Sequence, residues 1–420
     1  MTSIAAKHAK GKSAQDKIFG ANAAAVAAAA KYGKDNVTNA TIGAILDEDE
    51  QLVCLPTVEK VFRGLSTNEM IAYAPISGLP EYLDCVLTAA FGSSRPEGYI
   101  AAVATAGGTG AIHHAIWNYT DVGETVLCSD WYWGAYKVLC QDMGRDFTTY
   151  KMLDAENKFN LPALEEKVNE LLAKQDNLLY LLNTPAHNPT GYSLSEQDMD
   201  GVLALLKKAA VPGKNIVLFL DIAYIDYAGE KEEVRKIFKK LSGLPANILC
   251  IVGYSMSKGF TMYGQRTGAM IGVSSDKSVI DEFVAINQYT SRATWSNINR
   301  PAMRTLATIY SDKELLEKYH EGLICLSACL AGEVPQAILA GDYERAKQTA
   351  LYFRDLFGAG NYYLELQDHG LEEDSVVLPQ LIRLARETGI PMVATNDAHY
   401  ISRDDAKMQS ILLCIQTGKT

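Results

Sequence analysis

Apolar residues in the middle of the chain gather in short continuous runs, with stretches of helical periodicity between them. The runs are aliphatic or β-branched, and they have the length of strands that are buried on both faces. They occupy residues 99–105, 125–129, 177–182, 215–220 and 247–254. Strands that alternate with helices in this way predict a parallel sheet covered on both faces, a three-layer α/β domain. Ligands of such domains bind beyond the carboxyl ends of the strands.

Two of the intervening segments carry clear helix signals. Residues 161–174 follow Asn160, and residues 195–209 begin with Ser195, three positions before Asp198. Asparagine is a good cap for the first turn of a helix, and the Ser195 spacing is typical of a capping box. We therefore expect a helix in each segment.

Composition and charge exclude several classes of protein. The chain has 420 residues, of which 48% are hydrophobic and 21% are charged, and its formal net charge is -11. Disordered and fibrous proteins have other compositions, and the length suffices for two or three domains. An acidic surface is unsuited to binding nucleic-acid phosphates, so an anionic small substrate would need local arginines.

The sequence favours a cytoplasmic protein. The alanine-rich run at residues 21–30 lacks the leucine and isoleucine of a signal peptide, and no run has the length of a membrane span. The eight cysteines are scattered and form no CxxC pair. This usage favours a reducing compartment over a disulfide framework.

Candidate chemistry follows the last of the five apolar runs. Ser255, Ser257 and Lys258 come directly after it, and Arg266 lies eight positions beyond the lysine. A lysine beside a buried strand is suited to be a partly desolvated amine that reacts with a carbonyl, and an arginine fork suits a phosphate. Taken alone, the stretch is as compatible with a solvated loop lysine beside a structural arginine.

Three other segments have features of a binding site. The turn from Thr105 to Gly110, with three glycines, follows a strand and opens a helix, where free N–H groups can hold a phosphate. Asp221 ends a very apolar run, and residues 183–191 form a turn-rich stretch after another strand. Each also has an ordinary interpretation: a common strand-to-helix turn, a capping carboxylate and a tight loop.

Together these segments resemble the class I aminotransferase family, the fold-type I pyridoxal-phosphate enzymes that include aspartate and aromatic aminotransferases. The resemblance covers about residues 15–315, and its most specific parts are His187-Asn188-Pro189-Thr190-Gly191 and the Ser255-x-Ser257-Lys258 stretch with Arg266. It implies transfer of an amino group from an amino acid to a 2-oxo acid, with pyridoxal 5'-phosphate as cofactor. Lys258 would be the Schiff-base lysine that also moves the substrate proton.

The resemblance implies a role for each further residue of these motifs. Asp221 would pair with the pyridine nitrogen, Asn188 and Tyr224 would bind the phenolic oxygen, and Trp133 would stack on the ring. The phosphate would be held by Gly108, Thr109, Ser255 and Arg266. The family often has a serine where this chain has Gly107. That departure removes one hydroxyl from the phosphate site, and backbone donors can compensate.

Two residues carry the expectations about partners. Tyr73 matches the tyrosine that reaches the phosphate of the neighbouring subunit, which implies a homodimer. Arg292 matches the position that binds the side-chain carboxylate of dicarboxylic substrates. A surface arginine at a helix end is an equally good interpretation of Arg292, so the substrate stays open between acidic and aromatic amino acids.

The last quarter of the chain resembles a different family. From about residue 312, the stretches 322–333, 363–370 and 394–400 are similar to an internal piece of the polymerase-and-histidinol-phosphatase (PHP) domain of bacterial DNA polymerase III α subunits. In that family a βα barrel binds metal ions. Asp397 and His399 match ligands, with His369 and Cys329 as weaker candidates. The chain has seven histidines and no His-x-His pair ahead of this stretch, so we expect an incomplete, metal-free site.

We therefore interpret the chain as a fusion. We divide it into an N-terminal arm with part of a small domain (1–50), a large pyridoxal-phosphate domain (51–311) and a partial βα-barrel fragment (312–420). The fragment takes the place of the usual C-terminal small domain, whose arginine grips the substrate in the family, so we expect impaired transamination. Two alternatives stay open: a carbon–sulfur lyase on the same scaffold, and a metal-dependent phosphoesterase or polymerase-associated module in the tail.

The assignment of the lysine has a direct test. Lys258→Ala should abolish covalent retention of pyridoxal phosphate after borohydride reduction, because the other lysines lack the flanking motif. Mass spectrometry of the reduced protein measures the adduct. An adduct of unchanged yield in the variant would show that another lysine carries the cofactor.

Overall fold

The computed structural model describes residues 4–10, 12, 17–37, 39, 43–47, 51–312, 315, 325–328, 330, 332–358, 360–368 and 370–395. Two compact units share the chain. The first comprises residues 1–54 and 64–307, and the second comprises residues 55–63 and 308–420. Each unit is described by itself.

The first unit is built on a seven-stranded sheet with the order β1-β7-β6-β5-β4-β2-β3. All five strands expected from the apolar runs are present, which confirms the α/β fold class. The strands are β1 (Tyr99–Thr105), β2 (Thr125–Ser129), β3 (Asp146–Tyr150), β4 (Asn177–Asn183), β5 (Asn215–Asp221), β6 (Ile248–Ser255) and β7 (Gly268–Ser274).

The five expected strands run in one direction, as predicted, but the complete sheet is mixed. Strand β7 is antiparallel to both of its neighbours, β1 and β6, while the other pairs are parallel. The sequence pattern also missed β7 and the edge strand β3. Strand β7 is hard to predict because Gly268 and Gly272 lower its strand propensity. Both glycines allow neighbouring groups to approach the β7 backbone closely. A Cβ on Gly272 would lie 2.9 Å from Cγ of Phe283.

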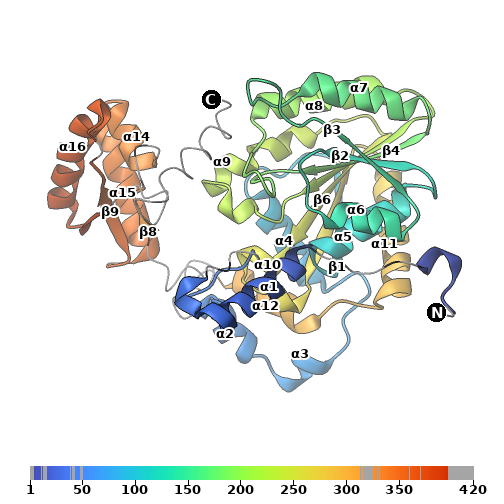
Figure 1. Cartoon of the computed structure of the whole chain (residues 1–420), viewed down its shortest axis with the longest axis horizontal. Helices are drawn as coiled ribbons and strands as arrows, with labels where there is room; N and C mark the ends of the chain where they lie inside the picture. Colours follow the sequence, from blue (N-terminus) through green and yellow to red (C-terminus); the bar gives the residue numbers. More distant parts are fainter. Residues whose placement is uncertain are drawn as a thin grey trace. The chain divides into compact units, whose positions relative to one another are not determined.

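Helices cover both faces of this sheet (Figure 1). Figure 1 shows α7 and α8 above the strands and α5, α6 and α11 below them. The expected capping signals are confirmed: Asn160 accepts from the N–H of Ala163, and Ser195 and Asp198 form a capping box. The α-helices here are α1 (Lys17–Tyr32), α3 (Thr67–Ile71), α4 (Pro80–Phe91), α5 (Gly107–Tyr119), α6 (Ala135–Asp142), α7 (Leu161–Leu172), α8 (Glu196–Ala209), α9 (Lys231–Arg235), α10 (Met256–Gly259), α11 (Lys277–Thr294) and α12 (Arg300–Ser311).

Single 3₁₀ turns connect several of these elements. They are η1 (Lys7–Ala9), η2 (Lys34–Asn36), η3 (Ile225–Tyr227), η4 (Lys236–Leu241) and η5 (Tyr263–Gln265). Turn η3 follows β5, and η5 lies between α10 and β7, so both belong to the loops at the strand ends. No described helix combines the length and the hydropathy that crossing a membrane requires.

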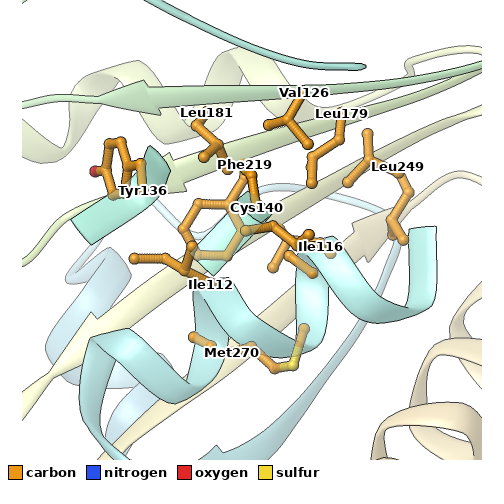
Figure 2. Close-up of a cluster of buried hydrophobic side chains, with 14 of the residues drawn as sticks. Ile112, Ile116, Val126, Tyr136, Cys140, Leu179, Leu181, Phe219, Leu249 and Met270 are labelled. Carbon is orange, nitrogen blue, oxygen red and sulfur yellow. The ribbon is translucent and has the colours of Figure 1, made fainter. Parts of the chain in front are cut away.

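The core of the first unit lies between the sheet and helices α5, α6 and α11. Figure 2 shows Ile112 and Ile116 of α5 facing Leu179, Leu181 and other strand residues. Strands β4, β5 and β6 are buried except at the first residue of β4 and of β5, and they contribute side chains to both faces, as period-two alternation requires. Burial of this apolar surface at about 25 cal/mol per Å² stabilises the platform that carries the loops.

The second unit contains a small parallel sheet with the order β10-β9-β8. Its buried core gathers side chains from the helices and from β9, for example Val334, Ala346, Leu364 and Leu381. Three parallel strands with connecting helices fit the expected βα fragment, and among the described residues they are too few to close a barrel. The elements are β8 (Cys325–Leu326), β9 (Tyr362–Leu366), β10 (Met392–Ala394), α2 (Pro56–Arg63), α14 (Glu333–Leu339), α15 (Tyr343–Phe357) and α16 (Glu372–Thr388).

The packing of β7 predicts the effect of one added methyl group. Gly272→Ala should lower the free energy of unfolding by about 1–3 kcal/mol, because its Cβ would press on the buried ring of Phe283. Gly20→Ala is the matched control, since a Cβ on Gly20 meets nothing within 4 Å. Urea denaturation followed by circular dichroism measures both. Equal midpoints for wild type and Gly272→Ala would contradict the close packing.

Candidate active site

The strand register brings the candidate residues to one edge of the sheet. Asn183 of β4 pairs with Asp221 of β5, and Ser255 of β6 and Thr105 of β1 both pair with Gly268. The carboxyl ends of β1, β4, β5 and β6 therefore lie at the same edge of the sheet as the amino end of β7. The loops that leave these ends carry the residues selected from the sequence, as the position rule for ligand sites in such sheets predicts.

The first turn of α5 lies directly against Ser255 and Arg266. Gly107 has a φ of +67°, and a Cβ there would lie 2.7 Å from Nη2 of Arg266. A Cβ on Gly108 would lie 3.5 Å from Cβ of Ser255. The first N–H groups of a helix have no intrahelical partner, so this turn, which includes Thr109, could bind an anion together with the guanidinium.

Arg266 is held in place by its own loop. One guanidinium nitrogen, Nη1, donates to the Ser257 hydroxyl at 3.2 Å and to the Tyr263 carbonyl at 3.0 Å. The backbone of Arg266 is in the left-handed region, with φ 49° and ψ 49°. A non-glycine residue in that region costs on the order of 1–3 kcal/mol, and such strain gathers at functional sites.

Lys258 lies within α10, directly after β6. Its Nζ donates to the carbonyl of Gly43 and lies 5.7 Å and 5.0 Å from the ring centroids of Tyr224 and Tyr263. The side chain is half-buried. Burial, together with the nearby positive charge of Arg266, lowers the pKa of the Lys258 ammonium. A larger share of this amine is therefore neutral, and able to act as a base or nucleophile, than in a free lysine.

Asp221 is a buried carboxylate at the end of β5. Its Oδ2 accepts from the Tyr136 hydroxyl at 2.5 Å, and its Oδ1 accepts from the N–H of Ala223 at 3.1 Å. Burial raises the pKa of Asp221, and the two donated hydrogen bonds oppose that rise. Both donors are neutral, so a cationic group at this carboxylate would be stabilised strongly.

Tyr136 is a residue of this site that the sequence analysis did not assign. It is 1% exposed on α6, and its pKa is raised, first by burial and then by Asp221, so its hydroxyl stays a donor. The Trp133 ring lies 5.7 Å away at an interplanar angle of 88°. The three-residue spacing from Trp133 is the one sequence signal, and it does not reveal that the hydroxyl reaches another strand.

Asn188 reaches the same strand ends through Asn183, a second residue that sequence reasoning missed. The N–H of Asn188 donates to Oδ1 of Asn183 at 2.6 Å, and the Asn183 amide donates to the Asp221 carbonyl at 2.7 Å. His187 bonds the Thr190 hydroxyl at 2.9 Å and the Trp131 carbonyl at 3.1 Å. Burial lowers the pKa of His187, so a neutral imidazole links these loops.

Two candidate residues point to solvent. Tyr73 is 88% exposed in the loop after α3. Arg292, exposed near the end of α11, donates to the Ser296 hydroxyl. For the described residues, the structure gives neither one a contact with the cluster at the strand ends.

The metal candidates of the tail are not placed. Asp397, His399, His369 and Cys329 all lie outside the described residues. Within the part of the chain that the structure describes, no three His, Cys, Asp or Glu side chains gather as metal ligands do.

Comparison with known proteins finds two families in the chain. The family described as "Aminotransferase class I and II" matches residues 35–337, which extends 22 residues past the expected end at 315. Among solved structures, an aminotransferase from Anaerococcus prevotii is 35% identical, with a TM-score of 0.74 and 84% of each chain covered. A mitochondrial aspartate aminotransferase from Trypanosoma brucei, at 22% identity and a TM-score of 0.57, shares the fold over 74% of this chain and 78% of its own.

The second family is that of the replicative polymerase. The DNA polymerase III α subunits of Borreliella burgdorferi and Treponema pallidum are 50% and 53% identical over 107 and 108 residues, which is 26% of this chain. The chain spans about 9% of the length of either polymerase. The two families, one matching residues 35–337 and the other about a quarter of the chain, are together consistent with a fusion.

Removal of the Tyr136 hydroxyl tests the environment of Asp221. Tyr136→Phe should weaken binding of pyridoxal phosphate about tenfold or more, since a hydrogen bond to a charged group contributes about 1.5–3 kcal/mol. Because that bond lowers the pKa of Asp221, its loss raises the pKa, and the deficit should grow as the pH falls. The affinity for pyridoxal phosphate is measured by fluorescence titration at several pH values between about 5.5 and 8.

Tyr180→Phe is the matched control for this change. It also removes a buried tyrosine hydroxyl from the same unit, one that pairs with the Tyr150 hydroxyl at 2.7 Å. Its affinity for pyridoxal phosphate should equal that of wild type. If Tyr136→Phe binds as tightly as the control at every pH, the hydroxyl does not support the carboxylate.

Proposed function

The chain belongs to the class I and II aminotransferases, pyridoxal-phosphate enzymes, and we propose that its site acts on acidic or aromatic amino acids. Its substrates are an amino acid and a 2-oxo acid. The observation that carries the proposal is the placement of Lys258 beside Arg266 and Tyr224, at the strand ends that also present Asp221. This placement supports the residue roles that the sequence resemblance implies.

The residues present fit pyridoxal phosphate at three points. Gly107 leaves room between α5 and Arg266 that any Cβ would fill, as a phosphate cradle requires. Asp221 has two neutral donors, so a protonated ring nitrogen would be its first charged partner among the described residues. Lys258 is a half-buried amine of lowered pKa.

Different side chains of the site have different roles in the proposed reaction. When bound, pyridoxal phosphate supplies an electron sink for the substrate α-carbon. Arg266, Ser255 and the first turn of α5 would hold its phosphate, and Asp221 would keep the ring nitrogen charged. The neutral Nζ of Lys258 accepts the proton from the substrate α-carbon and returns it during the transfer. The Trp133 ring supplies an apolar wall that excludes water.

We propose that the substrate side chain meets Arg292. A guanidinium binds a carboxylate through two parallel hydrogen bonds, which would favour aspartate or glutamate. In this chain the Arg292 guanidinium is exposed and bonds only a neutral hydroxyl, that of Ser296, among its described side-chain contacts. An incoming dicarboxylate would therefore not have to displace a competing carboxylate.

We also propose a homodimer in which Tyr73 reaches the partner's site. The aromatic ring is 88% exposed, and its neighbours Ile71 and Met70 are 77% and 42% exposed. Contiguous apolar residues at the surface of a folded domain are typical of an interface. The loop is anchored by Arg304, which contacts Glu69 and Glu81, both at 2.8 Å.

The polymerase-like tail supports the expectation of impaired turnover. The sequence resemblance assigns residues after about 312 to the polymerase family, whereas the aminotransferase match ends at residue 337. Two of its arginines already have partners in their own unit: Arg354 pairs with Asp355 at 2.7 Å, and Arg383 pairs with Glu387 at 2.8 Å. We propose that no tail arginine grips the substrate α-carboxylate.

Stopped-flow absorbance tests the reaction and the impairment together. With saturating aspartate, glutamate or an aromatic amino acid, conversion of the bound cofactor to the pyridoxamine form should be about a hundredfold or more slower than in a chimera. The reason is the loss of a bidentate contact and of closure. The chimera carries an aminotransferase small domain in place of the residues after 320.

The outcomes of this experiment separate the alternatives. Rapid, full conversion by the unmodified chain would show that the tail completes a working site. With S-methylcysteine as a further substrate, release of methanethiol, pyruvate and ammonia would identify the carbon–sulfur lyase. A phosphatase activity that chelators abolish would assign function to the tail instead.

A further inference from the structure

The backbone of Lys258 is held by a residue outside its own loop. The Tyr227 hydroxyl donates to the Lys258 carbonyl at 2.9 Å. Tyr227 ends the turn η3, which follows Asp221 and Tyr224 in the chain. The loop that carries the buried carboxylate therefore also contacts the turn that carries the lysine.

An ion pair between a buried arginine and Asp226 holds the same turn. Arg235 of α9 is 2% exposed, and its Nη2 contacts Oδ1 of Asp226 at 3.0 Å. Its Nε and Nη2 also donate to the carbonyl of Ala89, and its Nη1 donates to the carbonyl of Lys231. With every guanidinium nitrogen bonded, Arg235 has one orientation, and it fixes the Asp226 carboxylate in turn.

The second oxygen of Asp226 lies against the residue that follows Lys258. A Cβ built on Gly259 would lie 2.1 Å from Oδ2 of Asp226. Glycine is the residue that allows the carboxylate to approach the α10 backbone this closely. The contact therefore sets where α10 can lie relative to β5 and η3.

Helix α10 needs such external support. It has four residues, and a single helical turn is not stable by itself, because too few hydrogen bonds compensate for the fixed backbone. The inward contacts of Lys258 position its amine, whereas Tyr227 and Asp226 contact the backbone of the turn. These are two different sets of contacts, and only the second can hold the lysine when its amine reacts.

We propose that Tyr227, Asp226 and Arg235 are positioning residues that fix the backbone of Lys258 relative to Asp221. The proposal rests on the proposed function, in which Lys258 carries pyridoxal phosphate. These three residues, which we call the brace, touch neither the cofactor site nor the substrate directly. Their effect is on how often the amine occupies its reactive position.

The test measures the reactivity of Lys258 in the full chain. Apoenzyme is mixed with pyridoxal phosphate, samples are reduced with borohydride at timed intervals, and peptide mass spectrometry quantifies incorporation at Lys258. Tyr227→Phe removes one hydrogen bond from a half-exposed ring, so the rate should fall about two- to tenfold. Gly259→Ala should slow incorporation further, because its Cβ displaces Asp226.

Tyr119→Phe is the matched control. Its hydroxyl accepts from the Asn287 amide at 3.1 Å, at the carboxyl end of α5 and remote from the first turn of that helix. The control should incorporate pyridoxal phosphate at the wild-type rate. Its melting temperature should fall at least as much as that of Tyr227→Phe, because its hydroxyl is the more buried of the two.

Each outcome supports or overturns the brace. Slow incorporation in Tyr227→Phe and Gly259→Ala with a normal control supports it. Wild-type rates in both variants would overturn it while leaving the proposed function intact. If wild-type protein incorporates nothing at Lys258, the proposed function fails, and the brace fails with it.

Discussion

The site depends on how closely the backbone of α5 approaches the β6–β7 pair. A Cβ on Gly268 would lie 2.4 Å from the Tyr254 carbonyl oxygen and 2.8 Å from the carbonyl carbon of Gly107. Any larger residue at 268 would push the first turn of α5 away from the sheet. This contact places the first turn of α5 beside Ser255 and Arg266, so the proposed phosphate site depends on backbone packing.

Burial shifts the pKa of both ionisable groups at the strand ends, Asp221 and Lys258. Burial raises the pKa of Asp221 and lowers that of Lys258, so each group is pushed toward its neutral form. Tyr136 and the Ala223 N–H oppose this at the carboxylate, whereas Arg266 reinforces it at the amine. These opposite shifts leave a carboxylate without a cationic partner among the described residues and an amine that loses its proton more readily than a free lysine.

Each of the two units has its own hydrophobic core. The first has a continuous core between a seven-stranded sheet and its helices, and the second has its own cluster around Leu364 and Leu381. A core of its own explains how a piece of another family can follow an aminotransferase domain without unfolding it. Two of its described arginines, Arg354 and Arg383, form ion pairs with carboxylates of the same unit.

Local pattern determined the five main strands, the capped helices at Asn160 and Ser195, and the lysine and arginine motifs, since each depends on neighbours within a few positions. Only the tertiary structure decided the direction of β7, whose glycines look unfavourable until Phe283 and Tyr254 are seen against them. It alone joined Tyr136 to Asp221, 85 positions apart, and Tyr227 to Lys258, 31 positions apart. Hydrogen bonds between separate loops depend on strand register and helix packing, and no local periodicity records which hydroxyl will meet which partner.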